Sequence, residues 1–237
     1  MGHEGVRHPD APLAIVSGAS RGIGRAVACR LAPSHDLLLG GRDIGALNGL
    51  AELLGTARAR PWPVDITDHA ALARATAGIT RLDVLVHCAG VLTTAPVSET
   101  TGDMWRQVLE TNLIAAGELT RLLLPALRAA AGCVVFVNST VARRCSTPGV
   151  AAYAASKFGL GVLADCLRRE EADHGVRVSS VYPGRVDTDM QRGLGRDVEG
   201  RPADALQPPA VAEAVWFAVT AGRDTAIEEL TIRPAGF

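Results

Sequence analysis

The stretch Tyr153-Ala-Ala-Ser-Lys157 places a phenol and an ammonium group four residues apart at the start of a long helical pattern. Residues four apart lie one above the other on one face of an α-helix, so the two groups are expected to be neighbours. A nearby cation favours phenolate and lowers the phenol pKa from its ordinary value near ~10. The pair therefore predicts proton transfer by Tyr153, although the same spacing also occurs by chance on solvated helices.

The elements that must position this pair alternate along the whole chain. The expected strands are 13–17, 36–39, 58–64, 82–87, 133–138, 176–181 and 227–232, and the expected helices are 22–31, 44–54, 68–75, 102–130, 152–173 and 209–220. Apolar strands separated by helices are typical of a parallel sheet covered on both faces, the doubly wound α/β architecture. No linker or repeat divides residues 1–237, so we predict one domain, with a flexible segment at 1–11 and a substrate lid at 184–208.

The composition limits the partners of this domain. Hydrophobic residues make up 48% of the chain, and 24 basic residues against 25 acidic ones give a net charge of -1. No basic surface for nucleic acid or an anionic membrane is therefore expected. No apolar run approaches the ~18 residues of a membrane helix, and the first twelve residues lack the apolar core of a signal peptide. We predict a cytoplasmic protein.

The cysteines carry no metal-binding or disulfide pattern. They are Cys29, Cys88, Cys133, Cys145 and Cys166, an odd number at wide spacing and without a C-x-x-C pair. Buried thiols in a reducing compartment are expected, and no metal site is predicted.

The expected first strand runs into a glycine-rich loop and then a helix. The loop reads Ser17-Gly18-Ala-Ser20-Arg21-Gly22-Ile23-Gly24. Glycines permit a tight turn and a close approach of the backbone to a pyrophosphate, which binds at the helix N-terminus. A glycine cluster at the first strand-helix junction of an alternating chain predicts dinucleotide binding rather than a turn alone.

The end of the expected second strand bears on which dinucleotide binds. It reads Leu39-Gly40-Gly41-Arg42-Asp43. An acid at this place binds the ribose hydroxyl of NAD, whereas arginine accommodates the 2′-phosphate of NADP. Arg42 and Arg21 can converge on one phosphate, and Asp43 stands where the next helix needs an N-cap, so NADP(H) is favoured over NAD(H).

Two later strand ends add candidate contacts to the cofactor. The third expected strand ends Val64-Asp65-Ile66, on the side where the adenine would lie, and the fourth is followed by the small residues Ala89-Gly90. Ordinary turn chemistry remains an alternative for both.

Asn112 extends an apolar stripe formed by Trp105, Val108 and Leu109 in the following helix. An amide on a buried face needs partners, because an unpaired one costs ~1–3 kcal/mol. Asn112 is either a structural amide or a residue that holds a water or a backbone group near a site.

The expected fifth strand delivers Asn138-Ser139-Thr140 at its carboxyl end. Ligands of open α/β sheets bind outside the carboxyl ends of the strands, so a hydroxyl here is expected close to Tyr153.

Together these motifs resemble the short-chain dehydrogenase/reductase family from about residue 12 to the C-terminus. The matching elements are the glycine loop, the Asp65 turn, Ala89-Gly90, Asn112, the strand-end hydroxyl, the Tyr153 to Lys157 motif, and Pro183-Gly184 followed by Thr188. The resemblance implies a three-layer αβα Rossmann fold with a seven-stranded parallel sheet. It also implies a catalytic set of Asn112, a serine, Tyr153 and Lys157, and that Pro183, Gly184, Val186 and Thr188 line the nicotinamide and pyrophosphate.

The chain departs from the family pattern at three places. Ser17 replaces a threonine and keeps its hydroxyl, and His87-Cys88 replaces an amide pair that ties the sheet together. The catalytic hydroxyl is Ser139 when counted forward from Gly132, but Thr140 when counted back from Tyr153. Strands fix positions while loops absorb insertions, so Ser139 is preferred and Thr140 remains the alternative.

Our hypothesis is an NADP(H)-dependent interconversion of a carbonyl and an alcohol, with Tyr153 as the acid or base and Ser139 holding the carbonyl oxygen. Lys157 would lower the Tyr153 pKa and bind the nicotinamide ribose, and Asn112 would anchor a water that relays protons to Lys157. A non-catalytic NADP(H)-binding redox sensor is the alternative. The resemblance suggests a homodimer or homotetramer packed through the long expected helices 102–130 and 152–173. The arginines 143, 144, 185 and 192 allow an anionic substrate, although a solvated surface explains them as well.

Overall fold

The computed structural model describes residues 11–145, 147–192 and 205–235. Its strands are β1 (Leu13–Ser17), β2 (Asp36–Gly41), β3 (Ala59–Pro63), β4 (Val84–His87), β5 (Cys133–Val137), β6 (Arg177–Pro183) and β7 (Glu229–Ile232). They form one sheet in the order β3-β2-β1-β4-β5-β6-β7, and every neighbouring pair is parallel. All carboxyl ends therefore lie at one edge of the sheet, where the expected functional residues follow the strands.

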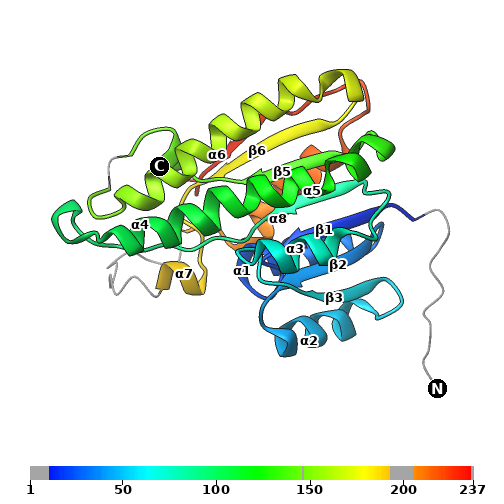
Figure 1. Ribbon diagram of the computed structural model, residues 1–237, viewed down its shortest axis with the longest axis horizontal. Helices are drawn as coiled ribbons and strands as arrows, with labels where there is room; N and C mark the ends of the chain where they lie inside the picture. Colours follow the sequence, from blue (N-terminus) through cyan, green and yellow to red (C-terminus); the bar gives the residue numbers. More distant parts are fainter. Residues whose placement is uncertain (1–10, 146, 193–204, 236–237) are drawn as a thin grey trace.

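Helices cover both faces of this sheet (Figure 1). The α-helices are α1 (Gly22–Leu31), α2 (Ile44–Leu54), α3 (His69–Thr76), α4 (Gly102–Leu109), α5 (Ala115–Ala130), α6 (Ala151–Glu170), α7 (Asp189–Arg192) and α8 (Pro208–Thr220). Residues of α1, α2 and α8 pack on one face, and residues of α3, α5 and α6 on the other. The predicted three-layer, doubly wound Rossmann fold is confirmed.

Successive side chains of a strand point to opposite faces, and both faces of this sheet are buried. In β1, Ala14 and Val16 join the core beneath α1 and α8, while Leu13 and Ile15 join the core beneath α5 and α6. Because both sides need apolar residues, the strand is a continuous apolar run rather than an alternating one.

Side-chain caps determine where several helices begin. The Asp43 carboxylate accepts a hydrogen bond from the Ala46 amide and begins α2, and Asp68 accepts one from the Ala71 amide and begins α3. Such caps satisfy backbone amides that have no partner inside the helix. The capping role predicted for Asp43 is confirmed.

The long helix expected over 102–130 is interrupted, which corrects the prediction of one continuous α-helix. A π-helical segment, η2 (Glu110–Ile114), lies between α4 and α5. π-Helical insertions are rare and often occur at functional sites, and this one contains Asn112.

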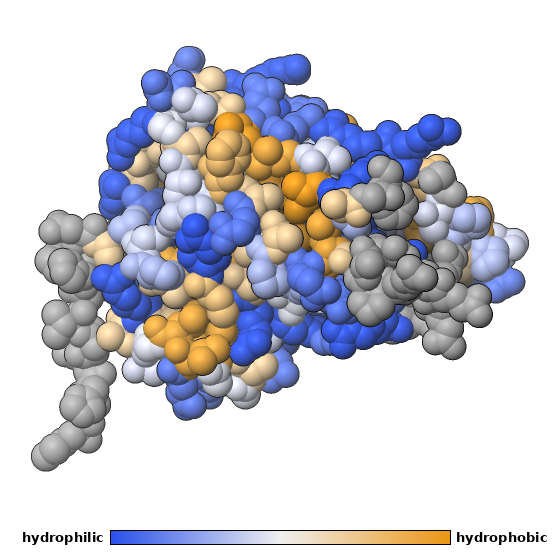
Figure 2. All heavy atoms as spheres, turned by 180° about the vertical axis from the view of Figure 1, so that it is seen from behind, coloured by the Kyte–Doolittle hydropathy of each residue, from blue (hydrophilic) through white to orange (hydrophobic). Residues whose placement is uncertain are grey.

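The three leucines of α6 lie in or against the chain's own core. Leu160 and Leu167 are buried and Leu163 packs against them. Figure 2 shows the opposite side of the molecule, covered by α1, α2 and α8, where apolar surface is interrupted by hydrophilic side chains. Exposed apolar side chains of these helices include Leu53 of α2 and Phe217 of α8.

The predictions for the cysteines and for the two segments expected to be mobile are not confirmed as a whole. Cys133 is buried and Cys29 and Cys88 are partly buried, but Cys145 and Cys166 are exposed, so the prediction of buried thiols is wrong for these last two. Residues 1–10 of the flexible segment expected at 1–11, and residues 193–204 of the lid expected at 184–208, lie outside the described residues. Within the described part of that lid, Val186 pairs with Leu206.

Candidate active site

Two adjoining cavities lie at the carboxyl edge of the sheet. The first, of about 410 Å³, is lined by the glycine loop and by the ends of β2, β3 and β4. The second, of about 450 Å³, is lined by the segments that follow β5, β6 and β7. Ile23, Thr188 and Met190 line both cavities, so the two spaces share a border.

The glycine loop needs its glycines for a close approach of backbone segments. Gly18 has φ +68°, and a Cβ added to it would lie 2.8 Å from the Ala89 backbone. A Cβ on Gly24 would lie 2.1 Å from the Gly18 carbonyl oxygen. Any other residue type would therefore displace the turn that precedes α1 and the strand end beside it.

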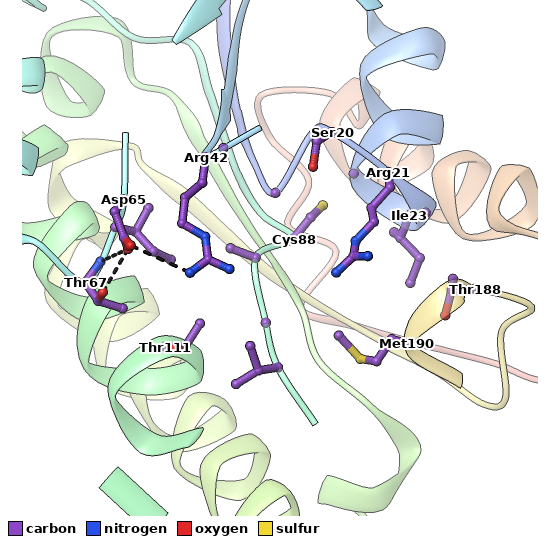
Figure 3. A pocket seen from close by; sticks show the side chains of 18 of the residues that line it. Ser20, Arg21, Ile23, Arg42, Asp65, Thr67, Cys88, Thr111, Thr188 and Met190 are labelled. Atoms are coloured by element: carbon purple, nitrogen blue, oxygen red, sulfur yellow. Dashed lines mark hydrogen bonds and ion pairs between the residues drawn. The ribbon is translucent and has the colours of Figure 1, made fainter. Parts of the chain in front are cut away.

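The first cavity contains two guanidinium groups. Figure 3 shows Arg21 from the glycine loop and Arg42 from the end of β2 directed into the same space. Arg42 lies 3.7 Å from the Asp65 carboxylate and is largely exposed. Hydrogen bonds from Thr67 lower the pKa of Asp65, with Arg42 contributing, so Asp65 both makes the turn and lines the cavity.

The Ser17 side chain at the end of β1 binds the loop that follows β4. The Ser17 hydroxyl oxygen accepts hydrogen bonds from the amides of Cys88 and Ala89, at 3.2 and 3.3 Å. The hydroxyl that the chain retains at position 17 thus fixes the backbone next to Gly90. A Cβ on Gly90 would lie 3.3 Å from the Asn112 side-chain oxygen, so the small residue brings these segments together.

The second cavity contains Ser139 and Tyr153. Burial raises the pKa of the Tyr153 phenol, and the nearby Ser139 hydroxyl partly offsets that rise. The direction is opposite to the one expected from the sequence, because the burial of the phenol has the largest effect on its pKa. Tyr153 is therefore a protonated phenol at neutral pH, a form that can donate a proton.

Lys157 is buried below Tyr153, as the four-residue spacing predicts. Its Nζ lies 5.9 Å from the centre of the Tyr153 ring and donates a 2.9 Å hydrogen bond to the Val137 carbonyl at the end of β5. Burial lowers the pKa of Lys157 to about 8. The ammonium is thus hydrogen-bonded to the end of β5, two residues before Ser139.

The Asn112 side chain connects the loop after β4 to α6. Its oxygen accepts from the Val91 amide at 2.8 Å, and its nitrogen donates to the Val91 carbonyl at 2.9 Å and to the Ser156 hydroxyl at 3.0 Å. Ser156 in turn donates to the Tyr153 carbonyl at 2.7 Å. Of the alternatives considered for Asn112, the structure shows it holding a backbone group near the site.

His87 and Cys88 occupy the positions where the family pattern has amides. The His87 Nε2 lies 2.9 Å from the Thr120 oxygen, and the imidazole stacks on Phe136 with ring centres 4.7 Å apart. Because the Thr120 hydroxyl donates to Ala116, it accepts from a neutral His87. Burial lowers the pKa of His87 to about 3 and raises that of Cys88 to about 12. The hydrogen bond to α5 ties the sheet to a helix without the usual amide.

The structure brings the expected residues together in three groups. The first cavity is lined by Gly18, Ser20, Arg21, Gly22, Ile23, Gly24, Arg42, Asp65, Ile66, Ala89, Gly90 and Thr188. The second is lined by Ser139, Tyr153, Pro183, Gly184, Val186 and Thr188, with the alternative Thr140 also present. Asn112 and Lys157 are buried beside them.

Sequence reasoning missed several residues of the site. One of them is Ser156, which hydrogen-bonds to the Asn112 side chain and to the Tyr153 carbonyl. A hydroxyl residue between Tyr153 and Lys157 was the feature of the sequence that could have indicated it. Thr111 and Met190 line the first cavity without any pattern that marks them, because they enter it through the folding of distant segments.

No group of three or more potential metal ligands occurs among the residues that the structure describes. In the same parts of the chain, no helix combines the length and apolar character needed to cross a membrane.

The model of the short chain dehydrogenase family matches residues 12–199. The fold and this match together show that the chain belongs to the short chain dehydrogenase family. The expected family membership is therefore confirmed, and the protein is an enzyme of the oxidoreductase class.

Relatives in sequence cover most of the chain. It is 33% identical to the glycine betaine reductase ATRR of Emericella nidulans over 95% of its own length, although it spans only 19% of that protein. It is 30% identical to an uncharacterized oxidoreductase of Staphylococcus haemolyticus, covering 94% of this chain and 96% of the relative. The 3-oxoacyl-(acyl-carrier-protein) reductase of Salmonella typhimurium is 33% identical over 78% of each protein.

Solved structures share the same architecture. An alcohol dehydrogenase from Thermococcus sibiricus, complexed with 5-hydroxy-NADP, superposes with a TM-score of 0.85 at 26% identity, over 94% of this chain and 97% of the other. A variant of the actinorhodin polyketide ketoreductase with NADPH gives a TM-score of 0.87 at 25% identity, over 97% and 98%.

Proposed function

We propose that this protein is an NADP(H)-dependent oxidoreductase that interconverts a carbonyl compound and its alcohol, with Tyr153 as the acid or base. The observation that carries the proposal is that the Ser139 hydroxyl and the Tyr153 phenol line one cavity, which borders the glycine loop. A proton donor and an oxygen-binding hydroxyl thus stand next to a space suited to a dinucleotide.

The residues of the first cavity fit a dinucleotide. Glycines at 18, 22 and 24 leave the loop without side chains where a pyrophosphate would approach, and the N-terminus of α1 favours an anion there. Asp65 and Ile66 would lie beside the adenine, and Ala89 and Gly90 beside a ribose. Pro183, Gly184, Val186 and Thr188 continue the lining into the second cavity, towards the expected place of the nicotinamide.

A bound nicotinamide cofactor supplies or accepts the hydride. In the reductive direction, the Tyr153 phenol gives its proton to the substrate oxygen, and the Ser139 hydroxyl donates a hydrogen bond to that oxygen. Lys157 would bind the nicotinamide ribose and supply positive charge below the phenol. Asn112 holds the Val91 backbone, and the water expected near Asn112 would relay protons to Lys157.

The amino-acid usage supports a special role for Lys157. The chain has 24 basic residues, and Lys157 is its only lysine. Arginine remains charged at all physiological pH values, whereas an amine can release its proton. Among the 24 lysine and arginine positions, position 157 is therefore the only one with a group that can release its proton near neutral pH, in agreement with a proton relay.

NADP(H) is the proposed cofactor because Arg21 and Arg42 both enter the first cavity. Two guanidinium groups suit the extra phosphate of NADP(H). The NADP-type complexes of the Thermococcus alcohol dehydrogenase and the actinorhodin ketoreductase agree with this choice.

A homodimer or homotetramer in the cytoplasm completes the proposal. Ile114 on η2 and Phe158 and Val162 on α6 are large apolar side chains that are exposed on the single chain. Burial against a second copy would remove this apolar surface from water.

The test is the oxidation of NADPH, followed by its absorbance, with the purified protein and a panel of ketones, aldehydes, quinones and 3-oxo acids. We expect at least one carbonyl to be reduced, and Tyr153→Phe to lower turnover by orders of magnitude while NADPH binding changes little. Normal turnover by Tyr153→Phe would contradict the assigned role. NADPH binding without turnover across the panel would favour a non-catalytic redox sensor instead.

A further inference from the structure

The second cavity has an uneven distribution of charge. Among the described residues, its lining includes three arginines, Arg144, Arg185 and Arg233, and no aspartate or glutamate. The chain as a whole has a net charge of -1, so this concentration of positive charge is local.

The three arginines reach the cavity from three neighbouring strands. Arg185 lies two residues after β6, Arg233 directly follows β7, and Arg144 belongs to the segment after β5. The Gly184 amide donates to the Ile232 carbonyl at 2.8 Å, and a Cβ on Gly184 would lie 3.6 Å from the Arg233 Cγ. Because the strands are parallel, all three side chains lie at the carboxyl edge of the sheet, where Ser139 also lies.

These three guanidinium groups are not neutralised by the described parts of the chain. Ion pairs occupy the two other arginines nearby: Arg143 pairs with Glu229, and Arg192 with Asp187 at 2.9 Å. Arg143 also lies over the Tyr182 ring, with its Cζ 3.9 Å from the ring centre. No ion pair or side-chain hydrogen bond of the described residues involves the three arginines of the second cavity, whose positive charges remain available to a ligand.

We propose that the substrate carries a carboxylate or phosphate group in addition to its carbonyl, and that Arg144, Arg185 and Arg233 bind this anionic group in the second cavity. The inference rests on the proposed function, because Ser139 and Tyr153 must bind the carbonyl end in the same cavity. Guanidinium groups match the planar oxygens of a carboxylate or phosphate and can donate two parallel hydrogen bonds. The distance from Ser139 and Tyr153 to the three arginines would then determine which length of substrate fits.

The kinetic test compares matched substrates that differ only in charge. These are 2-oxopentanoate, 3-oxopentanoate and 4-oxopentanoate, each against its methyl ester, and dihydroxyacetone phosphate against dihydroxyacetone. We expect kcat/KM to be at least about tenfold higher for one anion than for its neutral partner, which is typical of a charge-assisted hydrogen bond. The preference should shrink in concentrated NaCl, because the arginines are exposed and salt screens such charges.

The variants Arg144→Gln, Arg185→Gln and Arg233→Gln remove one charge each. We expect at least one of them to lower the ratio of kcat/KM for the anion over its neutral partner about tenfold. Arg74→Gln on α3 removes a charge that is also exposed but lines neither cavity, and it should leave the ratio unchanged. Equal kcat/KM values for every anion and its neutral partner, with turnover that depends on Tyr153, would overturn this inference and leave the proposed function intact.

A binding measurement separates the two proposals if no carbonyl is reduced. Calorimetric titration of the protein, with and without NADP+, uses pentanoate, inorganic phosphate and the neutral pentanamide as probes. Tighter binding of an anion than of pentanamide, weakened in the three arginine variants but not in Arg74→Gln, would support the anion site on its own. Identical titrations of the wild type and all variants would overturn it.

Discussion

The Lys157 ammonium donates its hydrogen bond to the Val137 carbonyl, at 2.9 Å, rather than to the Tyr153 phenol. The four-residue spacing brings Nζ to 5.9 Å from the centre of the Tyr153 ring, but β5 supplies the direct partner. The arrangement ties the end of β5, which carries Ser139, to the helix that carries Tyr153. It also leaves a buried ammonium group whose pKa is lowered to about 8.

Because Lys157 is the only lysine, its titration is directly measurable. Lysine labelled at Cε should give one NMR signal from the folded chain, with a midpoint near pH 8 rather than the ordinary value near ~10.4. Between pH 8 and the ordinary lysine pKa, the unfolded chain binds a proton at Lys157 that the folded chain has released. The contribution of Lys157 to the free energy of unfolding should therefore increase as the pH rises through this range. An ordinary midpoint in the folded protein would contradict the burial of the amine.

The choice between Ser139 and Thr140 has a direct test. Ser139→Ala should lower kcat about a hundredfold or more, because it removes a donor to the developing oxyanion. Thr140→Val, a matched loss of one hydroxyl in the same cavity, should change kcat only a few-fold. Nearly full turnover by Ser139→Ala together with an inactive Thr140→Val would reverse the assignment.

Arg42→Ala should weaken NADPH binding far more than NADH binding. The dissociation constant for NADPH is expected to rise roughly tenfold or more, which corresponds to one charge-assisted hydrogen bond. NADH lacks the 2′-phosphate and serves as the internal control in the same fluorescence titration. Equal changes for both cofactors would remove the proposed basis of the NADP(H) preference.

His87 should make the protein sensitive to mild acid. Its pKa is lowered from an ordinary value of 6.5 to about 3, so below pH 6.5 the unfolded state binds a proton that the folded state does not. The stability present above pH 6.5 is therefore lost as the pH falls towards 3, with a slope of up to about 1.4 kcal/mol per pH unit.

Urea unfolding at several pH values measures this slope. His87→Asn should remove it, whatever its effect at neutral pH, whereas His174→Asn changes an exposed histidine and should follow the wild type. The same slope in His87→Asn and in the wild type would show that other groups cause the acid sensitivity.

Two glycine-to-alanine variants should have opposite effects on the free energy of unfolding. Gly24→Ala places a Cβ 2.1 Å from the Gly18 carbonyl oxygen and should cost about 3 kcal/mol or more. Gly49→Ala in α2 meets nothing within 4 Å and should add about 0.5–1 kcal/mol, since alanine restricts the unfolded chain. Equal destabilisation by both would mean that the glycine loop can relax around the added methyl group.

The sequence by itself determined the features that depend on short-range rules. The bounds of α1 and α2 agree with the predicted 22–31 and 44–54, because apolar spacing and the Asp43 cap act within a few residues. The glycine loop and the Tyr153-Lys157 spacing were also readable, since strand, turn and helix geometry fix where such residues point. The alternation of apolar strands and helices was sufficient for the parallel sheet.

Only the tertiary structure decided which partner each polar group finds. The π-helical turn around Asn112, the hydrogen bond from Lys157 to Val137 and the upward shift of the Tyr153 pKa all arise where distant segments meet. The arginines are similar in sequence, yet Arg143 is paired with Glu229 while Arg144, its neighbour, lines the second cavity. Pairing and desolvation depend on contacts between segments that lie far apart in the chain, and no local pattern encodes them.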